Sequence, residues 1–457
     1  MTPLSRRSFL AKSAVAAAGL STLGQQSTAM VAPENRRHPL DGIESENIKI
    51  TDITVTPLSY VDRSLNLWRH VRYIVWKTDA ALVRIYTNQG VIGIGEANPY
   101  AGPDRIKKFT EEVLKPMLVG KNPFDVLRNP PDLEDARTKW AANYPESGYG
   151  SRIPNASWAG LDNALWDIIG KVKNKPVYEL LSPDGNSQKR IRMYASGGVE
   201  HEWYNNGEEF LITEALRYQA MGFDAFKLRT GTEWAYSNMT LEKYMPIMER
   251  LSEAVGPDFR LIHETMGPTG VSLDRVVDEF CPLLDDLGFH WFEDPMGGME
   301  GYARIAKKLK QLPVSGGAGM LTAEDNLPWV ESGAFEIVQA DCNTCGITEA
   351  WRISRQADAF GLPHCPHNWH GGLTTMSNAH LVAAIPNRHM LEINMTFNPL
   401  KDAVFKDPMV VKNGWIELND KPGYGVEVID DVEKKFPWNP GNYTLPRRFQ
   451  RDNTAMR

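Results

Sequence analysis

The sequence contains few cysteines: only Cys281, Cys342, Cys345 and Cys365 occur in 457 residues. Four cysteines do not make a disulfide scaffold in a chain of this length. Cys342 and Cys345 form a CxxC pair, but no second pair stands at a spacing that would complete the four ligands of a structural zinc site. We therefore expect buried thiols, with a local disulfide as the alternative.

Three further features are missing. No uninterrupted apolar run is long enough to cross a bilayer. The net charge of −7 provides no basic surface for nucleic acid. The glycine-rich stretch VSGGAGM, residues 314–320, lacks the spacing of a phosphate-binding loop. Since 42% of the residues are hydrophobic, the chain can bury a large core, and a small molecule is the expected partner.

The first 29 residues resemble a twin-arginine (Tat) export signal. The sequence SRRSFLAK, residues 5–12, precedes the apolar run SAVAAAGLSTLG, and Ser27 and Ala29 are small residues at the spacing of a cleavage site. About a dozen apolar residues are too few to span about 30 Å of hydrocarbon, which disfavours a membrane anchor. We expect export to the periplasm by the Tat machinery, cleavage after Ala29, and a polar linker over residues 30–47.

The remaining sequence predicts two domains. Residues 48–155 have an α+β pattern: IKITDITVTPLSY alternates like a strand, two strands flank an Asn-Gln-Gly turn, and PDRIKKFTEEVLKPMLVG has helical periodicity. Residues 156–400 alternate short apolar runs with helical segments. Residues 401–457 are strand-like in part and are expected to return to the first domain.

Polar residues in the second domain recur at the length of one strand plus one helix. The intervals are 37, 29, 25, 23, 26 and 25 residues along the series Lys227, Glu264, Glu293, Ala318, Asp341, His367 and Glu392. This spacing predicts a (β/α)8-type barrel, in which the active site lies at the carboxyl ends of the strands. A doubly wound open sheet is the alternative.

The residue types at these strand ends suit acid–base chemistry. Glu264 and Glu293 can share a hard cation. Asp341 can orient His367 as a general base. Glu392 can donate a hydrogen bond when protonated.

Each residue also has a structural explanation. Lys227 and Arg229 can simply pair with Glu264 inside the barrel. Glu293 can belong to a turn, and His367 can be an interior histidine with satisfied hydrogen bonds. Several ionisable groups at one barrel mouth are costly unless a metal or ligand organises them, which favours a functional site.

The order and spacing of these motifs resemble the enolase superfamily, specifically its mandelate racemase/muconate lactonizing enzyme branch of acid-sugar dehydratases and racemases. The resemblance covers about residues 48–400 and includes the segment of helical periodicity GLDNALWDIIGKVKNKPVYELL. It implies an α+β capping domain over a modified (β/α)7β barrel. It also implies a Mg²⁺ ion that binds the substrate carboxylate while a base removes the adjacent α-proton.

The resemblance assigns roles to matching positions. Glu264 and Glu293 match metal ligands. His367 and Asp341 match the base dyad, Glu392 matches the acid that stabilises the enolate, and Lys227 matches a contact to the substrate carboxylate.

Arg229 departs from the racemase pattern, in which a second base, a lysine, stands at this position. Arginine stays protonated in proteins and is a poor proton acceptor. One base favours dehydration of an aldonate or aldarate to a 2-keto-3-deoxy acid. A racemase, an epimerase or a cycloisomerase is the enzymatic alternative.

Ala318 is a second departure, because the family usually has a third metal-binding carboxylate on the fifth strand. Neighbouring Glu324 looks like part of a helix cap instead. Mg²⁺ often uses only one or two protein carboxylates, so the sequence predicts one weakly held, water-completed Mg²⁺ per subunit. A catalytically silent sugar-acid-binding protein is the alternative from another functional class.

The substrate is only coarsely indicated. Arg69, His70 and Arg72 lie among aromatic residues of the capping segment, and Trp369 and His370 follow His367. These residues suit a polyhydroxylated acid, although a solvated basic stretch explains the first three equally well. We also expect a homo-oligomer.

Overall fold

The first sheet of the described chain is antiparallel, with the strand order β1–β3–β4. β1 spans Ile50–Val61, β3 spans Lys77–Thr87 and β4 spans Ile92–Ala97. The turn between β3 and β4 contains Gly90, whose φ of 75° suits glycine. The predicted hairpin is confirmed. The computed structural model describes residues 38–61, 68, 73–143, 152–182, 185–199, 203, 207–231 and 234–446, so the predicted export signal lies outside the described residues.

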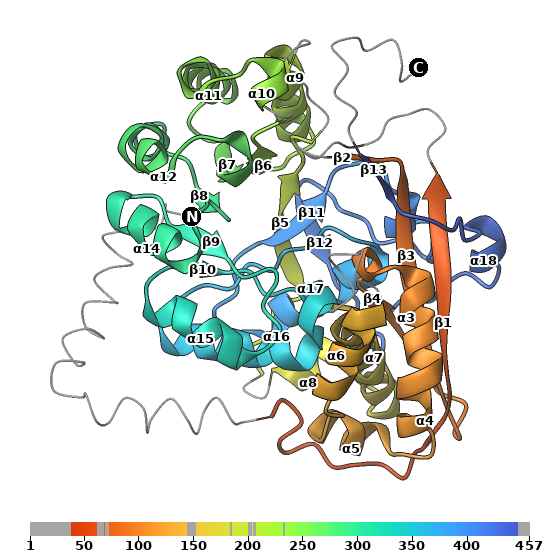
Figure 1. The fold of residues 1–457 in the computed structure, drawn as a ribbon. Helices are drawn as coiled ribbons and strands as arrows, with labels where there is room; N and C mark the ends of the chain where they lie inside the picture. The colour runs from red at the N-terminus through yellow and green to blue at the C-terminus, as the bar shows by residue number, and fades with distance from the viewer. Residues whose placement is uncertain are drawn as a thin grey trace, which may run out of the picture.

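Helix α7 lies directly on this sheet because β4 carries glycines at the contact. A Cβ atom on Gly93 would lie 2.2 Å from the backbone oxygen of Ala164, and one on Gly95 would lie 2.4 Å from that of Gly160. The helices of this half of the molecule are α3 (Pro103–Phe109), α4 (Lys115–Leu118), α5 (Pro123–Arg128), α6 (Glu134–Asn143), α7 (Ile153–Val172) and α8 (Val177–Leu181). They pack beside the antiparallel sheet (Figure 1).

The second half of the chain forms a curled parallel sheet in the order β10–β9–β8–β7–β6–β5–β11. Its strands are β5 (Arg190–Ser196), β6 (Ala225–Arg229), β7 (Arg260–Glu264), β8 (Trp291–Glu293), β9 (Val314–Gly316), β10 (Ile337–Val338) and β11 (Leu391–Asn394). Parallel bridges from His364 to Val338 and to Arg388 close the ring between β10 and β11. The sheet is therefore a barrel and not an open sheet.

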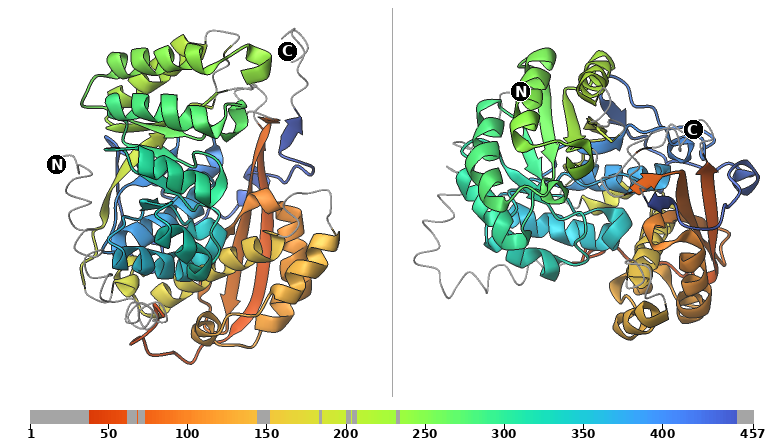
Figure 2. Two further views of the ribbon diagram at one scale, coloured as in Figure 1. Left: turned by 60° about the vertical axis from the view of Figure 1, so that its left-hand side comes forward. Right: turned by 45° about the horizontal axis from the view of Figure 1, so that its top comes forward.

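Helices surround the barrel and connect its successive strands along the chain (Figure 2). They are α9 (Gly207–Ala220), α10 (Trp234–Ser237), α11 (Leu241–Val255), α12 (Leu273–Arg275), α13 (Cys281–Asp286), α14 (Gly298–Lys308), α15 (Ala323–Glu331), α16 (Cys342–Ala359) and α17 (Gly372–Ala384). No helix follows β11 before the chain leaves the barrel for residues 399–401, a short 3-10 turn. This arrangement confirms the modified (β/α)7β barrel with a capping domain.

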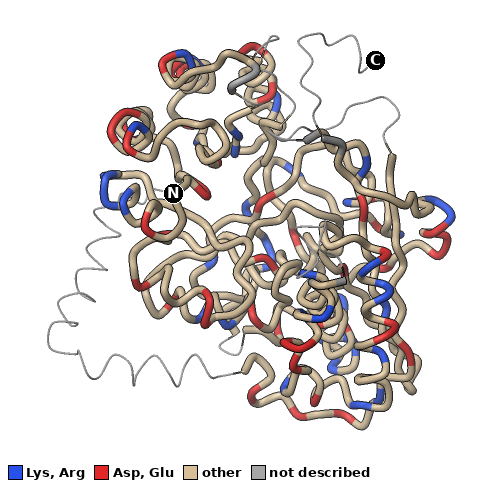
Figure 3. Tube along the Cα trace, in the orientation of Figure 1, with Lys and Arg blue, Asp and Glu red and all other residues tan. Residues whose placement is uncertain are grey.

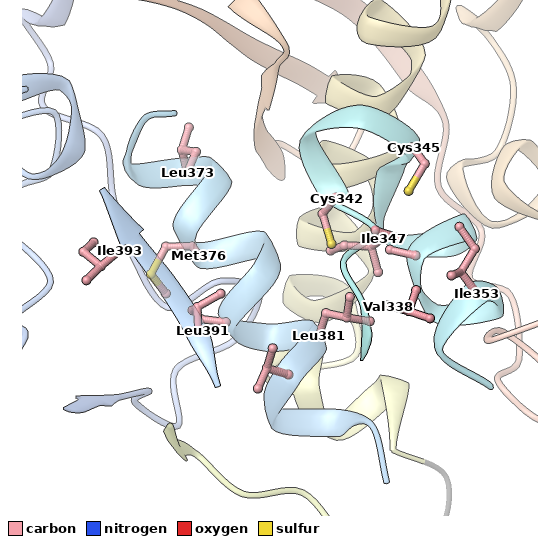
Figure 4. Packing of buried hydrophobic residues seen from close by; sticks show 14 of the residues in the cluster. Val338, Cys342, Cys345, Ile347, Ile353, Leu373, Met376, Leu381, Leu391 and Ile393 are labelled. Carbon is pink, nitrogen blue, oxygen red and sulfur yellow. The ribbon is translucent and has the colours of Figure 1, made fainter. Parts of the chain in front are cut away.

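All four cysteines are free and buried, as expected. Cys342 and Cys345 lie at the start of α16 in the same apolar cluster as Val338, Ile347 and Ile353 (Figure 4). Burial raises the pKa of both thiols well above the usual value. The CxxC pair therefore contributes to packing rather than to a metal site or a disulfide.

The C-terminal segment joins the two halves. β12 (Trp415–Glu417) pairs antiparallel with β5 of the barrel, an addition that the sequence did not predict. The chain then passes through α18 (Val432–Lys435) to β13 (Thr444–Pro446), the last described strand, which pairs with β2 (Tyr73–Val75).

Charged residues of both signs are interspersed over the outer helices (Figure 3). Among the described residues, none of the helices combines the length and the apolar character that crossing a membrane requires.

Candidate active site

Charged side chains from four barrel strands meet around Lys227 of β6. The Lys227 side chain is fully buried and its Nζ donates a hydrogen bond to Glu293 of β8. The same Nζ lies 2.8 Å from Oε1 of Glu392 and 3.3 Å from Oε2 of Glu264. Burial alone lowers the pKa of Lys227, but the charges of Glu293, Glu392 and Glu264 raise it overall. Lys227 is therefore a permanent cation at the centre of three carboxylates.

Arg229 stands two residues further along the same strand and faces the same side. Its Nε donates to Oε2 of Glu264 over 2.7 Å, and its guanidinium lies 4.4 Å from the ring centroid of Trp369. Within the described residues, its terminal nitrogens make no hydrogen bond. The pairing of Lys227 and Arg229 with Glu264, considered above as a structural explanation, is present. Arg229 nevertheless keeps donors with which it can receive an anion.

His367 and Asp341 form the predicted dyad. Nδ1 of His367 lies 2.9 Å from Oδ2 of Asp341. Asp341 is fully buried and His367 is 20% exposed, so the histidine ring borders solvent on one side. Burial lowers the pKa of His367, but Glu392 and Asp341 outweigh it and raise the pKa to about 8. Once neutral, this imidazole has the orientation and the basicity of a general base.

Glu392 on β11 lies in the site beside Lys227. Burial alone raises its pKa, but the charges of Lys227 and His367 lower it overall. Its Oε2 accepts the backbone N–H of Asn368 over 2.8 Å. The lowered pKa favours the ionised form of Glu392, which accepts hydrogen bonds, and the donor role of its protonated form stays a prediction.

Ala318 stands in the turn after β9 and provides no carboxylate. Glu324, the nearest acid along the chain, lies 2.8 Å from Arg352 in an ion pair and belongs to the first turn of α15. Thr322 caps that helix by accepting the backbone N–H of Asp325. The interpretation of this stretch as a helix cap is confirmed.

The glycines of the VSGGAGM stretch serve packing. A Cβ atom on Gly316 would lie 2.6 Å from the ring of Phe335. Gly317 has a φ of 101°, which L-residues rarely adopt. The close approach at Gly316 is therefore to the ring of Phe335.

The two carboxylates expected to bind Mg²⁺ are already engaged by N–H groups. Oε1 of Glu293 accepts from Lys227, and its Oε2 accepts from Trp291 over 3.1 Å and from Gln339 over 2.7 Å. Oε2 of Glu264 accepts from Arg229. No group of three His, Cys, Asp or Glu side chains within the described parts of the chain has a metal-binding arrangement. As these side chains lie, Oε2 of Glu264 and both oxygens of Glu293 face donors, and Nζ of Lys227 lies between the two carboxylates, so the residues fit Mg²⁺ poorly.

Trp369 and His370 line a pocket next to His367. The His370 ring centroid lies 6.2 Å from that of His367 and 4.6 Å from that of Tyr100. The same pocket is lined by Trp68 and Tyr443, which the sequence did not single out. The other three predicted substrate residues, Arg69, His70 and Arg72, lie outside the described residues.

Glu96 at the end of β4 is a buried carboxylate that the sequence analysis missed. It accepts the backbone N–H groups of Gly371 over 3.0 Å and Thr374 over 3.2 Å, at the start of α17. Burial raises its pKa to about 7. Glu96 therefore ties the capping sheet to the loop that carries His367. The only signal in the sequence is a lone acid at the end of an apolar, glycine-containing strand.

Helix α7 supports the other member of the dyad. Asp341 is the N-cap of α16, which is kinked at Gly346 with a φ of 82°. Asn163 accepts the backbone N–H of Ile347 over 3.1 Å, and Asp162 accepts that of Thr348 over 3.0 Å. These bonds satisfy the N–H groups freed by the kink and fix the start of α16.

Comparison with known proteins identifies the family. Residues 69–182 match the N-terminal domain of mandelate racemase and muconate lactonizing enzyme, and residues 211–432 match the enolase C-terminal domain-like family. An arabinonate dehydratase of Saccharolobus solfataricus is 30% identical over 77% of this chain and 89% of its own. A D-xylonate dehydratase of Haloferax volcanii is 29% identical over 77% of this chain and 84% of its own.

Solved structures agree with this assignment. A crystal structure of an enolase superfamily member from Polaromonas sp. JS666 is 28% identical, with a TM-score of 0.71, and covers 86% of this chain and 99% of its own. The 3,6-anhydro-D-galactonate cycloisomerase from Zobellia galactanivorans is 25% identical, with a TM-score of 0.67, and covers 85% of this chain and 99% of its own. The chain therefore belongs to the mandelate racemase and muconate lactonizing enzyme branch of the enolase superfamily.

Proposed function

We propose that this protein is a hydro-lyase that dehydrates a sugar acid, an aldonate or aldarate, to its 2-keto-3-deoxy acid. The observation that carries the proposal is the single His367–Asp341 dyad at the barrel mouth, with Arg229 in place of a second base. Relatives that are named arabinonate and D-xylonate dehydratase support the reaction class.

The reaction follows from the dyad. Asp341 accepts the Nδ1 proton of His367, so Nε2 of the neutral ring is the basic atom. Nε2 takes the α-proton, and the electron pair of that C–H bond forms the enediolate. The enediolate then expels the β-hydroxyl group, which leaves as water with the proton that His367 returns. The resulting enol tautomerises to the 2-keto acid.

Arg229 is the proposed anchor for the substrate carboxylate. Its terminal nitrogens are donors without a described acceptor, and its planar fork matches a carboxylate. Lys227 is less suited to the direct contact that the resemblance assigned to it, because three glutamates already surround its ammonium group. A single oxyanion donor contributes about 3 to 4 kcal/mol to a transition state, so Arg229 can account for a substantial part of the acceleration.

A screen of sugar acids for 2-keto acid formation tests this function. Keto acid that forms with the native protein and is lost in His367→Asn supports dehydration. Exchange of the α-proton with solvent deuterium without keto acid indicates a racemase, an epimerase or a cycloisomerase. Thermal stabilisation by a sugar acid with neither exchange nor keto acid indicates a binding protein and overturns the proposal.

The cofactor of this chain is a separate question. Mg²⁺ is the cofactor of the enolase superfamily. One Mg²⁺ per subunit on Glu264 and Glu293 stays a prediction for this chain, and the N–H donors on both carboxylates disfavour it.

We also propose export by the Tat route, on the basis of Arg6 and Arg7 and the apolar run that follows them. The test is the distribution of the full-length chain between cytoplasm and periplasm. Replacement of both arginines by lysine is expected to retain the protein in the cytoplasm. Unchanged periplasmic protein contradicts the proposal. The predicted homo-oligomer is tested by light scattering on the same protein.

A further inference from the structure

The acidic centre of the barrel already contains two cations that belong to the chain. We propose that Lys227 and Arg229 permanently take the place of a divalent metal in this protein, and that the site needs no bound Mg²⁺. The inference goes beyond the proposed function and is testable without a substrate.

The position of Lys227 is the first argument. Glu264, Glu293 and Glu392 come from three different strands, and their carboxylates converge on one ammonium group. A cation held jointly by Glu264 and Glu293 would have to approach the position between their carboxylates, where Nζ already lies. Since the Lys227 side chain is completely buried, it has no solvent-exposed position to which it can withdraw.

The donors around the carboxylates are the second argument. Trp291 and Gln339 donate to Oε2 of Glu293, while Lys227 donates to its Oε1. A metal ion requires lone pairs that face it, and an N–H group on the same lone pair excludes it. Three of the roughly four lone-pair positions of Glu293 are therefore taken by donors, and the one that remains is on Oε1, beside the ammonium group of Lys227.

The missing carboxylate is the third argument. Ala318 has no oxygen in its side chain, and Glu324 is paired with Arg352 on the outer helices. The absence of a carboxylate at position 318 and the pairing of Arg229 with Glu264 both weaken metal binding. One removes a ligand, and the other adds a positive charge at 2.7 Å from a remaining ligand.

Direct measurement of Mg²⁺ binding tests the inference on the native protein. We expect no saturable heat up to millimolar Mg²⁺, no stoichiometric metal after purification, and the same Tm in MgCl2, in EDTA and in NaCl of matched ionic strength. Binding of one Mg²⁺ that Glu264→Gln abolishes and Glu324→Gln retains would overturn the proposal. Glu324→Gln is the matched control because it removes a nearby carboxylate that already has an arginine partner.

Lys227→Met is the second test. This variant leaves three carboxylates and only one arginine at the centre, so it is expected to acquire a need for a divalent cation. Its Tm should rise by a few degrees on addition of Mg²⁺, whereas the native Tm stays constant. Lys401→Met is the control, because Lys401 is a largely buried lysine that donates to the carbonyl groups of Asn394 and Thr396 instead of carboxylates. A folded Lys227→Met protein whose Tm does not change on addition of Mg²⁺ contradicts the proposal.

These outcomes are independent of the proposed reaction. Mg²⁺ binding to the native protein overturns the inference and leaves dehydration intact. Absence of keto acid both with and without added Mg²⁺ overturns dehydration and leaves the inference intact, whereas keto acid that forms only with added Mg²⁺ overturns the inference and supports dehydration.

Discussion

Asp341 holds His367 from a position that is itself fixed. Its Oδ2 lies 2.9 Å from Nδ1 of His367. Its Oδ1 accepts from the backbone N–H of Asn343 and from the side chain of Asn378. Because both oxygens are engaged, the imidazole is held in one orientation with Nε2 directed away from the carboxylate.

Asp341→Asn should reduce the rate of α-proton removal by about two to four orders of magnitude, because the base loses its orientation and part of its basicity. Asparagine still caps a helix, so α16 and the fold should persist. The rate is measured as deuterium exchange at the α-carbon, with circular dichroism as the check on folding. An unchanged exchange rate in a folded variant would mean that Asp341 does not position the base.

The pH dependence of the rate should follow His367. Its pKa is raised to about 8, and the base is active only when neutral. kcat/KM should therefore rise with pH and level off above about pH 8. In Asp341→Asn the inflection should move to lower pH, since one of the groups that raise the pKa is gone. A profile that is flat between about pH 6 and pH 9 would contradict the assignment of His367.

The free energy of unfolding should also depend on the protonation of His367. A folded-state pKa above the ordinary histidine value favours the native state when the ring is protonated. This contribution is fully present below pH 6.5 and is lost as the pH rises through about 8. It amounts to about 2 kcal/mol. Free energies of unfolding of the native protein and of His367→Asn should therefore converge across this window, and a constant difference would argue against the raised pKa.

Arg229→Lys tests the substrate anchor. Lysine keeps the charge but loses the planar fork, and a charged hydrogen bond contributes about 1.5 to 3 kcal/mol. kcat/KM should fall by roughly ten- to a hundredfold. The loss should appear mainly as a higher KM if Arg229 binds the carboxylate equally strongly in the bound substrate and in the transition state. Arg217→Lys on α9 is a control on an outer helix. Equal KM values for Arg229→Lys and the native protein would place the carboxylate elsewhere.

Glu96→Ala tests the link between the capping sheet and the His367 loop. The change leaves the backbone N–H groups of Gly371 and Thr374 without their acceptor. The free energy of unfolding should decrease by about 1 to 3 kcal/mol, as measured by denaturant titration. Glu433→Ala, at a side chain that is 69% exposed, should have little effect. If both variants are equally stable, Glu96 does not connect the two parts.

The barrel was predictable because its strand ends recur in the sequence. Glu264 and Glu293 end β7 and β8, while Lys227 and Glu392 lie within the short strands β6 and β11, and a ring of parallel strands brings such positions together. The hairpin at Gly90 was predictable from local turn chemistry alone. These features depend on periodicity and spacing, which one sequence contains.

The partners within the ring were not predictable. Whether Lys227 contacts a substrate or three glutamates depends on side-chain positions in space, and the protonation of Glu392 depends on that choice. Glu96 was missed for the same reason, since its partners at 371 and 374 are backbone groups that are distant in sequence. The partners of Lys227 and Glu96 and the protonation of Glu392 depend on burial and on contacts between residues distant in sequence.

Helix α7 has a consequence for how a substrate reaches the pocket. It is buried along most of its length, with the glycines of β4 on one side and α16 of the barrel on the other. A helix enclosed in this way cannot serve as a hinge, because opening would expose the apolar surface on both of its faces. We therefore expect the capping domain to keep its position on the barrel during turnover, so that a substrate reaches His367 from the side on which the ring is exposed.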